Sequence, residues 1–216
     1  MESNPFSDAI HFLQLPAATT AVYWLLLLAS IAVAAYCFTA IPEQRAARHL
    51  GNWLCRLLIG SMWWQQTLWK LPPYYTDQPD QPFGATGLAY WMMQMVKGAA
   101  FRIQSDLVDK VILPHFYLFA PGVYALEALT AASLILGLFV RFWGVVGALQ
   151  ILNLWLGLYN AEGEWPWTYF FLLVLQVIFA LHRFGRSLGI DAIIVERYGR
   201  ARSTSLLGRL ALEAAT

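Results

Sequence analysis

The sequence lacks the short motifs that mark the commonest cofactor sites. It contains no GxGxxG or Walker loop for a nucleotide, no HExxH for zinc, no CxxC dithiol and no CxxCH for covalent haem. The cysteines Cys37 and Cys55 lie near the ends of the first two apolar segments with His49 between them, and two ordinary thiols are favoured there over a metal site. Redox chemistry in this chain would therefore need a partner protein or a diffusible cofactor.

Charged residues are also scarce. Only 12% of the 216 residues are Asp, Glu, Lys or Arg, whereas 59% are hydrophobic, and soluble domains carry roughly 25% charged residues. The 14 Lys and Arg nearly balance the 13 Asp and Glu, so the net charge of +1 provides no electrostatic footprint for nucleic acid. This composition excludes an ordinary soluble domain and a disordered chain, and it predicts that the solvent is lipid.

Five apolar segments are candidates to cross a bilayer, which requires roughly 20 residues per helix. They are residues 20–41, 53–71, 121–140, 142–161 and 165–181. The second is the least regular, because Arg56 and Lys70 lie near its ends, and we expect both side chains to snorkel to the headgroups. The first does not resemble a cleaved signal, because Glu2 and Asp8 precede it without any Lys or Arg.

The distribution of Lys and Arg predicts the orientation, since these residues stay on the cytoplasmic side. With the N-terminus outside, the inner side holds Arg45, Arg48, Arg56, Arg141, Arg183, Arg186, Arg197, Arg200, Arg202 and Arg209. The outer side keeps Lys70, Lys97, Arg102 and Lys110. We therefore expect five spans in a prokaryotic cytoplasmic membrane, with the C-terminus in the cytoplasm.

The long outer segment, residues 72–120, is predicted to contain structure of its own. Its Pro-rich start is expected to be a loop that places Tyr74 and Tyr75 among the headgroups. Ser105 is expected to cap a later short helix, which Pro114 interrupts or kinks. Between them, a helical spacing of three and four predicts an amphipathic helix on the membrane or over the bundle mouth, with an apolar face of Leu88, Trp91, Met92, Met95, Val96 and Ala99.

The inner segment after the last span is expected to form a turn at residues 185–189. An interfacial amphipathic helix should follow and end near Gly199. The tail from Arg200 is basic and is expected to contact anionic lipid or to fray.

Glu127 is the strongest indication of a site, because a carboxylate inside a span is costly unless it is paired or protonated. Lys70 ends the second span on the same outer side, so the two side chains can meet across the bundle. A structural ion pair is one interpretation. The other is a pocket for a quinone headgroup or an anionic substrate, with Lys70 and Glu127 as catalytic residues and with Arg102, His115, Gln66 and Trp69 as binding residues.

Other polar and aromatic residues have simpler interpretations. Gln150 and Asn153 are expected to form hydrogen bonds to neighbouring helices. Most tryptophans near the outer ends of the spans are expected to form an interfacial belt, and these are Trp63, Trp64, Trp69, Trp165 and Trp167.

Four segments taken together resemble the DoxX-like membrane proteins, and more closely the DoxD-type small subunit of thiosulfate:quinone oxidoreductase. They are RLLIGSMWWQQTLWKL (56–71), EALTAASLILGLFVRFWG (127–144), EWPWTYFFLL (164–173) and FGRSLGIDA (184–192). The resemblance implies an all-α, integral membrane four-helix bundle over residues 52–192, with a long outer insert at 72–120. Residues 1–51 add an extra transmembrane helix, and residues 193–216 form a cytoplasmic amphipathic tail.

The resemblance also implies a function, which is to pass electrons from a reduced sulfur donor such as thiosulfate to membrane quinone with a partner membrane or periplasmic subunit. No outer cysteine is present for sulfur chemistry, so that chemistry would fall to the partner. The alternative is a non-catalytic, accessory transmembrane subunit of a larger complex. A small-molecule transporter is less favoured, because no inverted repeat or broken helix is evident.

Overall fold

The computed structural model describes residues 4–14, 18–76, 78, 80, 83, 86–200 and 213–216. These residues are all helical or irregular, and they contain no β-strand. The α-helices are α1 (Pro5–Gln14), α2 (Ala18–Ala40), α3 (Ala47–Thr67), α4 (Gly87–Gly98), α5 (Arg102–Leu107), α6 (Phe116–Leu136), α7 (Val140–Gly157), α8 (Pro166–Leu181) and α9 (Ile190–Arg200).

Three helical segments are long and apolar enough to cross a membrane. They are Ala18–Ala40, Arg102–Leu136 and Val140–Gly157, and Pro166–Leu181 is a shorter apolar helix. Only 22–39% of the residues in their most apolar stretches are buried within the protein, so most of this apolar surface faces outward. A surface of this kind is suited to lipid rather than water.

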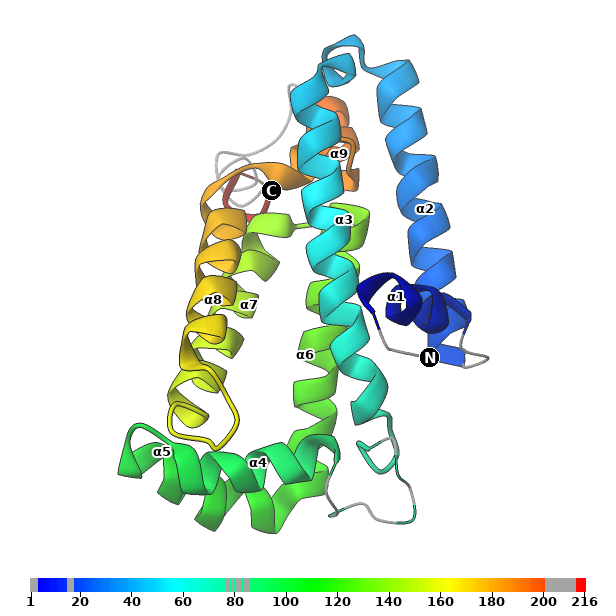
Figure 1. The fold of residues 1–216 in the computed structure, drawn as a ribbon. Coiled ribbons are helices and arrows are strands. Elements are labelled where there is room, and N and C mark those ends of the chain that lie inside the picture. Colours follow the sequence, from blue (N-terminus) through cyan, green and yellow to red (C-terminus); the bar gives the residue numbers. More distant parts are fainter. Residues whose placement is uncertain are drawn as a thin grey trace.

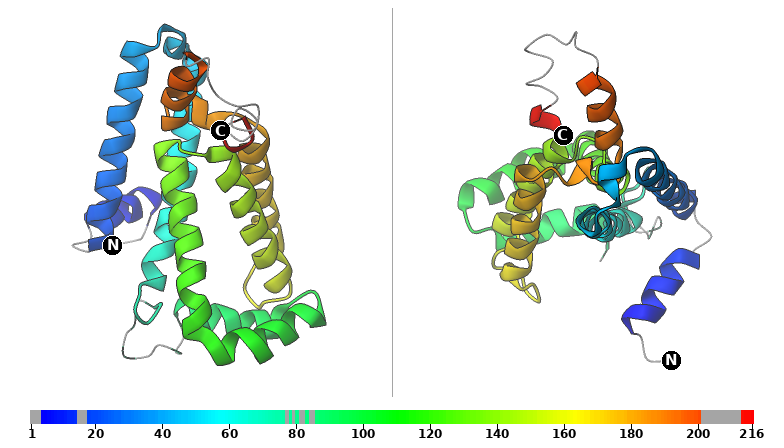
Figure 2. Two further views of the ribbon diagram at one scale, coloured as in Figure 1. Left: turned by 180° about the vertical axis from the view of Figure 1, so that it is seen from behind. Right: turned by 90° about the horizontal axis from the view of Figure 1, so that it is seen from above.

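The long helices run side by side and short helices cover both ends (Figure 1). α3 packs on α6, α7 packs on α8, and α2 packs against α6 on the other side of the bundle. α4 and α5 lie across one end, whereas α9 and the C-terminal residues lie at the other. Seen along the bundle, α1 projects from one side (Figure 2).

Close helix contacts depend on glycines in the facing helices. A Cβ on Gly144 of α7 would lie 2.6 Å from the backbone nitrogen of Ala180 in α8. A Cβ on Gly60 of α3 would lie 2.8 Å from Cγ1 of Ile135 in α6. Small residues therefore let these backbones approach closely, which is the usual basis of helix packing in membranes.

In the outer segment, the amphipathic helix is present as predicted, but the position of Tyr75 differs from the prediction. α4 buries Leu88, Met92 and Met95, as the spacing predicts. Tyr75, however, is buried beside Phe116 rather than placed among headgroups, because its ring fills the space between the loop and the start of α6.

The expected cap at Ser105 is wrong. α5 begins earlier, at Arg102, and the Ser105 hydroxyl donates instead to the carbonyl of Val96 at 2.6 Å, which ties α5 to α4. The helical path continues through a π-helical turn (Val108–Ile112) and a 3-10 turn (Leu113–His115) that contains Pro114. The irregular turns thus occur where Pro114 was expected to interrupt the helix.

Two tryptophans expected in an interfacial belt belong to the core. Trp63 and Trp64 are buried among residues of α2, α6 and α7, because α3 turns this face toward α6. Trp165 and Trp167 are exposed at the start of α8, as a belt requires. α9 confirms the helix expected after residue 189, while Arg202, Arg209 and the rest of residues 201–212 lie outside the described residues.

Candidate functional site

Lys70 and Glu127 form a buried ion pair between the end of α3 and the middle of α6. The Lys70 ammonium donates to both carboxylate oxygens of Glu127, at 2.6 and 2.7 Å. Each residue is only 4% exposed, so Lys70 does not snorkel as the sequence predicted. It reaches sideways because α3 ends in a 3-10 turn, Leu68–Lys70, that directs the side chain toward α6.

The ion pair lines a cavity of about 570 Å³. α4 closes one side of it with Leu88, Trp91, Met92 and Met95, and side chains of α5, the π-helical turn, α6, α7 and α8 contribute to the rest of the wall. The wall is mainly apolar and aromatic. Trp69 lies with its ring centroid 4.2 Å from the Lys70 nitrogen and 6.2 Å from the ring of Trp91.

A few polar side chains converge on the same cavity. The Gln104 amide donates to the backbone carbonyl and to the side-chain oxygen of Asn153, both at 2.9 Å, and its own oxygen is buried without a hydrogen bond. The Tyr169 hydroxyl donates to Glu164 at 2.8 Å. A largely apolar pocket with a few placed donors and acceptors is the usual form of a small-molecule site.

The helix-to-helix hydrogen bonds expected for α7 are present. Gln150 donates to the Thr130 hydroxyl of α6 at 3.4 Å, and Asn153 accepts from Gln104 of α5. Gln150 and Asn153 also line the cavity, which the sequence did not predict.

The structure brings together four of the six predicted site residues. Gln66 and Trp69 line the cavity with Lys70 and Glu127. Arg102 and His115 are not part of its wall. The Arg102 side chain is 92% exposed and pairs with Asp106 at 3.8 Å, because the start of α5 points away from the bundle. His115 is exposed, and its Nδ1 lies 2.9 Å from the carbonyl oxygen of Val111 one turn earlier.

A second buried charge, Arg56, lies at the opposite end of the bundle. Its guanidinium donates to the carbonyls of Leu134 at 2.6 Å and Ser187 at 3.0 Å. The residue is 0% exposed, so the expectation that it snorkels is also wrong. It points inward because Gly137 and Gly189 leave space for the guanidinium.

Asp191 of α9 lies near Arg56 and contacts the start of α7. Its carboxylate accepts the backbone N–H groups of Phe139 at 2.7 Å and Val140 at 3.2 Å. Burial raises the pKa of Asp191 to about 6, although these two N–H groups and the nearby Arg56 and Arg186 act in the opposite direction. The carboxylate therefore satisfies the first N–H groups of a helix, as an N-capping residue does.

The loop between α8 and α9 is held from three sides. Gln44 donates to the carbonyl of Arg186 and accepts the N–H of Leu188. His49 and Asn52 both contact the Ser187 hydroxyl. The sequence predicted a turn at residues 185–189 and singled out FGRSLGIDA by resemblance, but it did not predict the hydrogen bonds that hold this loop.

The two clusters of buried polar groups are suited to different roles. The groups around Arg56 and Asp191 form hydrogen bonds to backbone atoms of α6, of the start of α7 and of the loop before α9, and they are suited to fixing the fold. The pair of Lys70 and Glu127 faces a cavity, and it is the part of the described structure best suited to bind a small molecule. Comparison of the chain with protein-family models, with curated proteins and with solved structures gives no match.

Proposed function

We propose that this chain is an integral protein of a prokaryotic cytoplasmic membrane that binds a quinone headgroup in the cavity beside Lys70 and Glu127. The single observation that carries the proposal is a buried ion pair that forms part of an apolar, aromatic-walled cavity of about 570 Å³. An ammonium has three N–H donors, of which Glu127 takes two. The third is available to a ring carbonyl, while Trp69 and Trp91 offer stacking surfaces.

Five spans with the N-terminus outside are part of this proposal. α2, α3, α6, α7 and α8 run alongside one another (Figure 1), so α3 and α8 lie at the same depth as the three helices that are long and apolar enough to cross. Arg141, Arg183 and Arg186 gather at the end of the bundle opposite to α4, which supports placing that end in the cytoplasm.

The DoxX-like family, and its DoxD type in particular, is the proposed relationship. Residues of three of its four segments meet in two places, with Lys70 against Glu127 at one end and Arg56 near Asp191 at the other. α3, α6, α7 and α8 correspond to the four-helix core, and α2 is the extra helix. This convergence supports the proposed relationship, because the segments that carry the resemblance also contact one another in the fold.

The proposed activity is that of a small subunit that passes electrons to quinone. Two thiosulfate ions give one tetrathionate ion and two electrons, and these electrons with two protons reduce one quinone to quinol. The chain's own residues would bind and orient the quinone, while a partner subunit would oxidise the sulfur donor.

The test is photolabelling with an azido-decylubiquinone, applied to the full chain in lipid nanodiscs. Labels should map to cavity residues of α4, α6 and α7. A Met92→Trp substitution should reduce this labelling strongly, because Met92 forms part of the wall. Met93→Trp on the same helix is the matched control and should label normally. Labels that fall only on the outward face of α2, unchanged in both variants, would refute quinone binding at this place.

A non-catalytic, accessory subunit is the second candidate. The observation that favours it is the exposed apolar surface of α5 and the following turn, which includes Ile103, Leu107 and Val111 at one end of the molecule. Native mass spectrometry after mild detergent extraction separates the two. A chain that is always recovered with a cofactor-bearing partner and that takes no quinone label supports the accessory function.

A further inference from the structure

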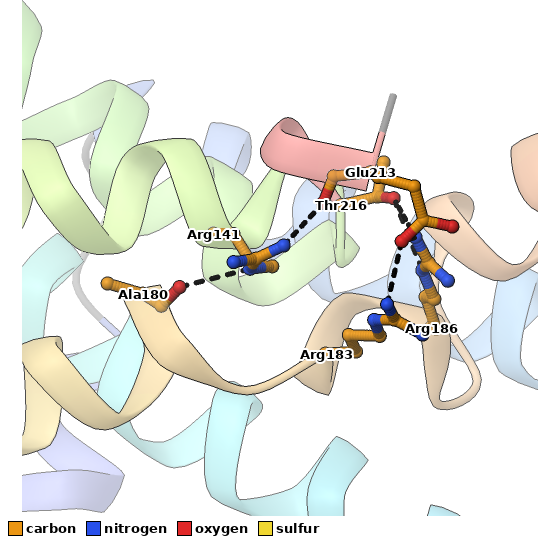
Figure 3. A network of polar contacts seen from close by, with 6 residues as sticks. All are labelled: Arg141, Ala180, Arg183, Arg186, Glu213 and Thr216. Atoms are coloured by element: carbon orange, nitrogen blue, oxygen red, sulfur yellow. Dashed lines mark hydrogen bonds and ion pairs between the residues drawn. The ribbon is translucent and has the colours of Figure 1, made fainter. Parts of the chain in front are cut away.

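Three arginines gather around Glu213 at the end of the bundle that carries α9 (Figure 3). Arg183 and Arg186 contact the same carboxylate oxygen of Glu213, at 2.7 and 2.9 Å. Arg141 donates to the backbone carbonyl of Glu213. A hydrogen bond from Arg186 holds the pKa of Glu213 below its usual value, so this carboxylate is ionised at neutral pH.

Two of the arginines are positioned by contacts that do not involve Glu213. Arg141 Nε donates to the carbonyl of Ala180 at the end of α8, at 3.1 Å. The backbone of Arg186 is fixed because its carbonyl accepts from Gln44, and its side chain is only 16% exposed. Arg183 completes the cluster with a side chain that is 58% exposed. The Arg186 guanidinium also donates to the Thr216 hydroxyl, at 3.0 and 3.2 Å, so residues 213–216 hold it in place, whereas α8 holds Arg141. The result is a cluster of three guanidinium groups that converge on one anion.

The three arginines lie where the exposed apolar surface of α7 and α8 ends. Phe142 follows Arg141 and is 52% exposed, and Leu181 precedes His182 and Arg183 and is 67% exposed. Exposed apolar side chains therefore give way to guanidinium groups within one or two residues on both α7 and α8. In a membrane protein this is the level of the lipid headgroups.

We infer that Arg141, Arg183 and Arg186 form a binding site for the phosphoryl group of an anionic phospholipid, and that Glu213 occupies this site in its absence. Guanidinium groups are strong donors to phosphate oxygens, and here two of them already converge on one carboxylate oxygen. Glu213 fills that place with one carboxylate, so the lipid and residues 213–216 compete for the same donors. The site lies at the opposite end of the bundle from the Lys70 cavity and does not depend on the quinone proposal.

The test measures lipid binding to the full chain by native mass spectrometry in detergent, with phosphatidylglycerol as the probe. Zwitterionic phosphatidylcholine serves as the reference lipid. Arg183→Gln should raise the Kd for phosphatidylglycerol about tenfold, the size expected when one charge-assisted hydrogen bond is lost. Arg102→Gln, which removes an exposed arginine at the other end of the bundle, is the matched control and should leave the Kd unchanged.

Glu213→Gln provides the discriminating result. Removal of the competing carboxylate charge should lower the Kd for phosphatidylglycerol several-fold and should not change that for phosphatidylcholine. Equal effects of Arg183→Gln and Arg102→Gln, or no effect of Glu213→Gln, would overturn the inference. Displacement of the lipid by an equimolar amount of inorganic phosphate would also overturn it, because the site would then recognise the free anion.

Discussion

The Lys70 ammonium lies within 2.7 Å of both carboxylate oxygens of Glu127, although the two residues are 57 positions apart in the chain. Both side chains are almost fully buried. Two charges in such a place stabilise each other, but the cost of removing them from water offsets much of this attraction. The largest effect on stability is therefore expected when one partner is removed and the other charge stays buried.

The first prediction concerns the removal of either partner. Glu127→Gln or Lys70→Met should lower the free energy of unfolding by about 3–5 kcal/mol, because each leaves one buried charge uncompensated. The double substitution should cost clearly less than the sum of the two single ones. The free energy of unfolding of the wild type, the two single variants and the double variant is measured in mixed micelles with increasing dodecyl sulfate.

The control for this cycle is the exposed pair of Asp106 and Lys110, whose nitrogen and oxygen lie 2.8 Å apart. Its single substitutions should cost at most about 1 kcal/mol each. Additive losses for Lys70 and Glu127, or losses as small as those of the exposed pair, would show that the buried charges do not stabilise one another.

The second prediction concerns the contact between α7 and α8. Gly144→Ala should destabilise the protein, because the new Cβ would lie 2.6 Å from the nitrogen and 2.9 Å from the Cα of Ala180, and backbone atoms cannot move aside cheaply. Gly122→Ala is the matched control, since nothing lies within 4 Å of its Cβ position in α6. That control should be neutral or stabilise by up to about 1 kcal/mol. Unfolding midpoints that fall equally in both variants would contradict the close packing at Gly144.

The third prediction concerns pH. Burial raises the pKa of Asp191 from 3.8 in an unfolded chain to about 6 in the fold. Between these values the folded chain binds the proton and the unfolded chain does not, so stability should fall as the pH rises from about 4 to 6. Thermal unfolding across this range should show a decline in the wild type and a flatter curve in Asp191→Asn. A midpoint that declines as steeply in the variant would show that other groups cause the pH dependence.

The sequence predicted the parts of this fold that depend on periodicity and composition. Apolar length located α2, α6, α7 and α8, and the spacing of Leu88, Met92 and Met95 located α4. The pairing of Lys70 with Glu127 was also predictable, because a buried carboxylate needs a partner and few cations lie at the same depth.

Several of the wrong predictions concern long side chains that can extend in either of two directions. Arg56 and Lys70 lie near the ends of an apolar segment, and hydropathy alone cannot tell whether they reach outward to headgroups or inward to a carbonyl or carboxylate. The outcome depends on Gly137 and Gly189, which are distant in the sequence and open the space that Arg56 fills. Arg102 failed as a site residue for a similar reason, since the direction of α5 depends on its contacts with α4.

The fourth prediction concerns the arginine at the other end of the bundle. Arg56 uses two nitrogens to join the carbonyl of Leu134 in α6 to that of Ser187 in the loop before α9. Arg56→Lys keeps the charge but replaces the planar fork with a point donor, so at least one of these carbonyls should lose its partner. We expect a loss of about 1–3 kcal/mol and faster amide hydrogen exchange in residues 187–192. Arg48→Lys is the matched control, because Arg48 lies exposed on the first turn of α3. Exchange that accelerates equally in both variants, or only at the Lys70 end of the bundle, would contradict the view that Arg56 fastens the loop to the helices.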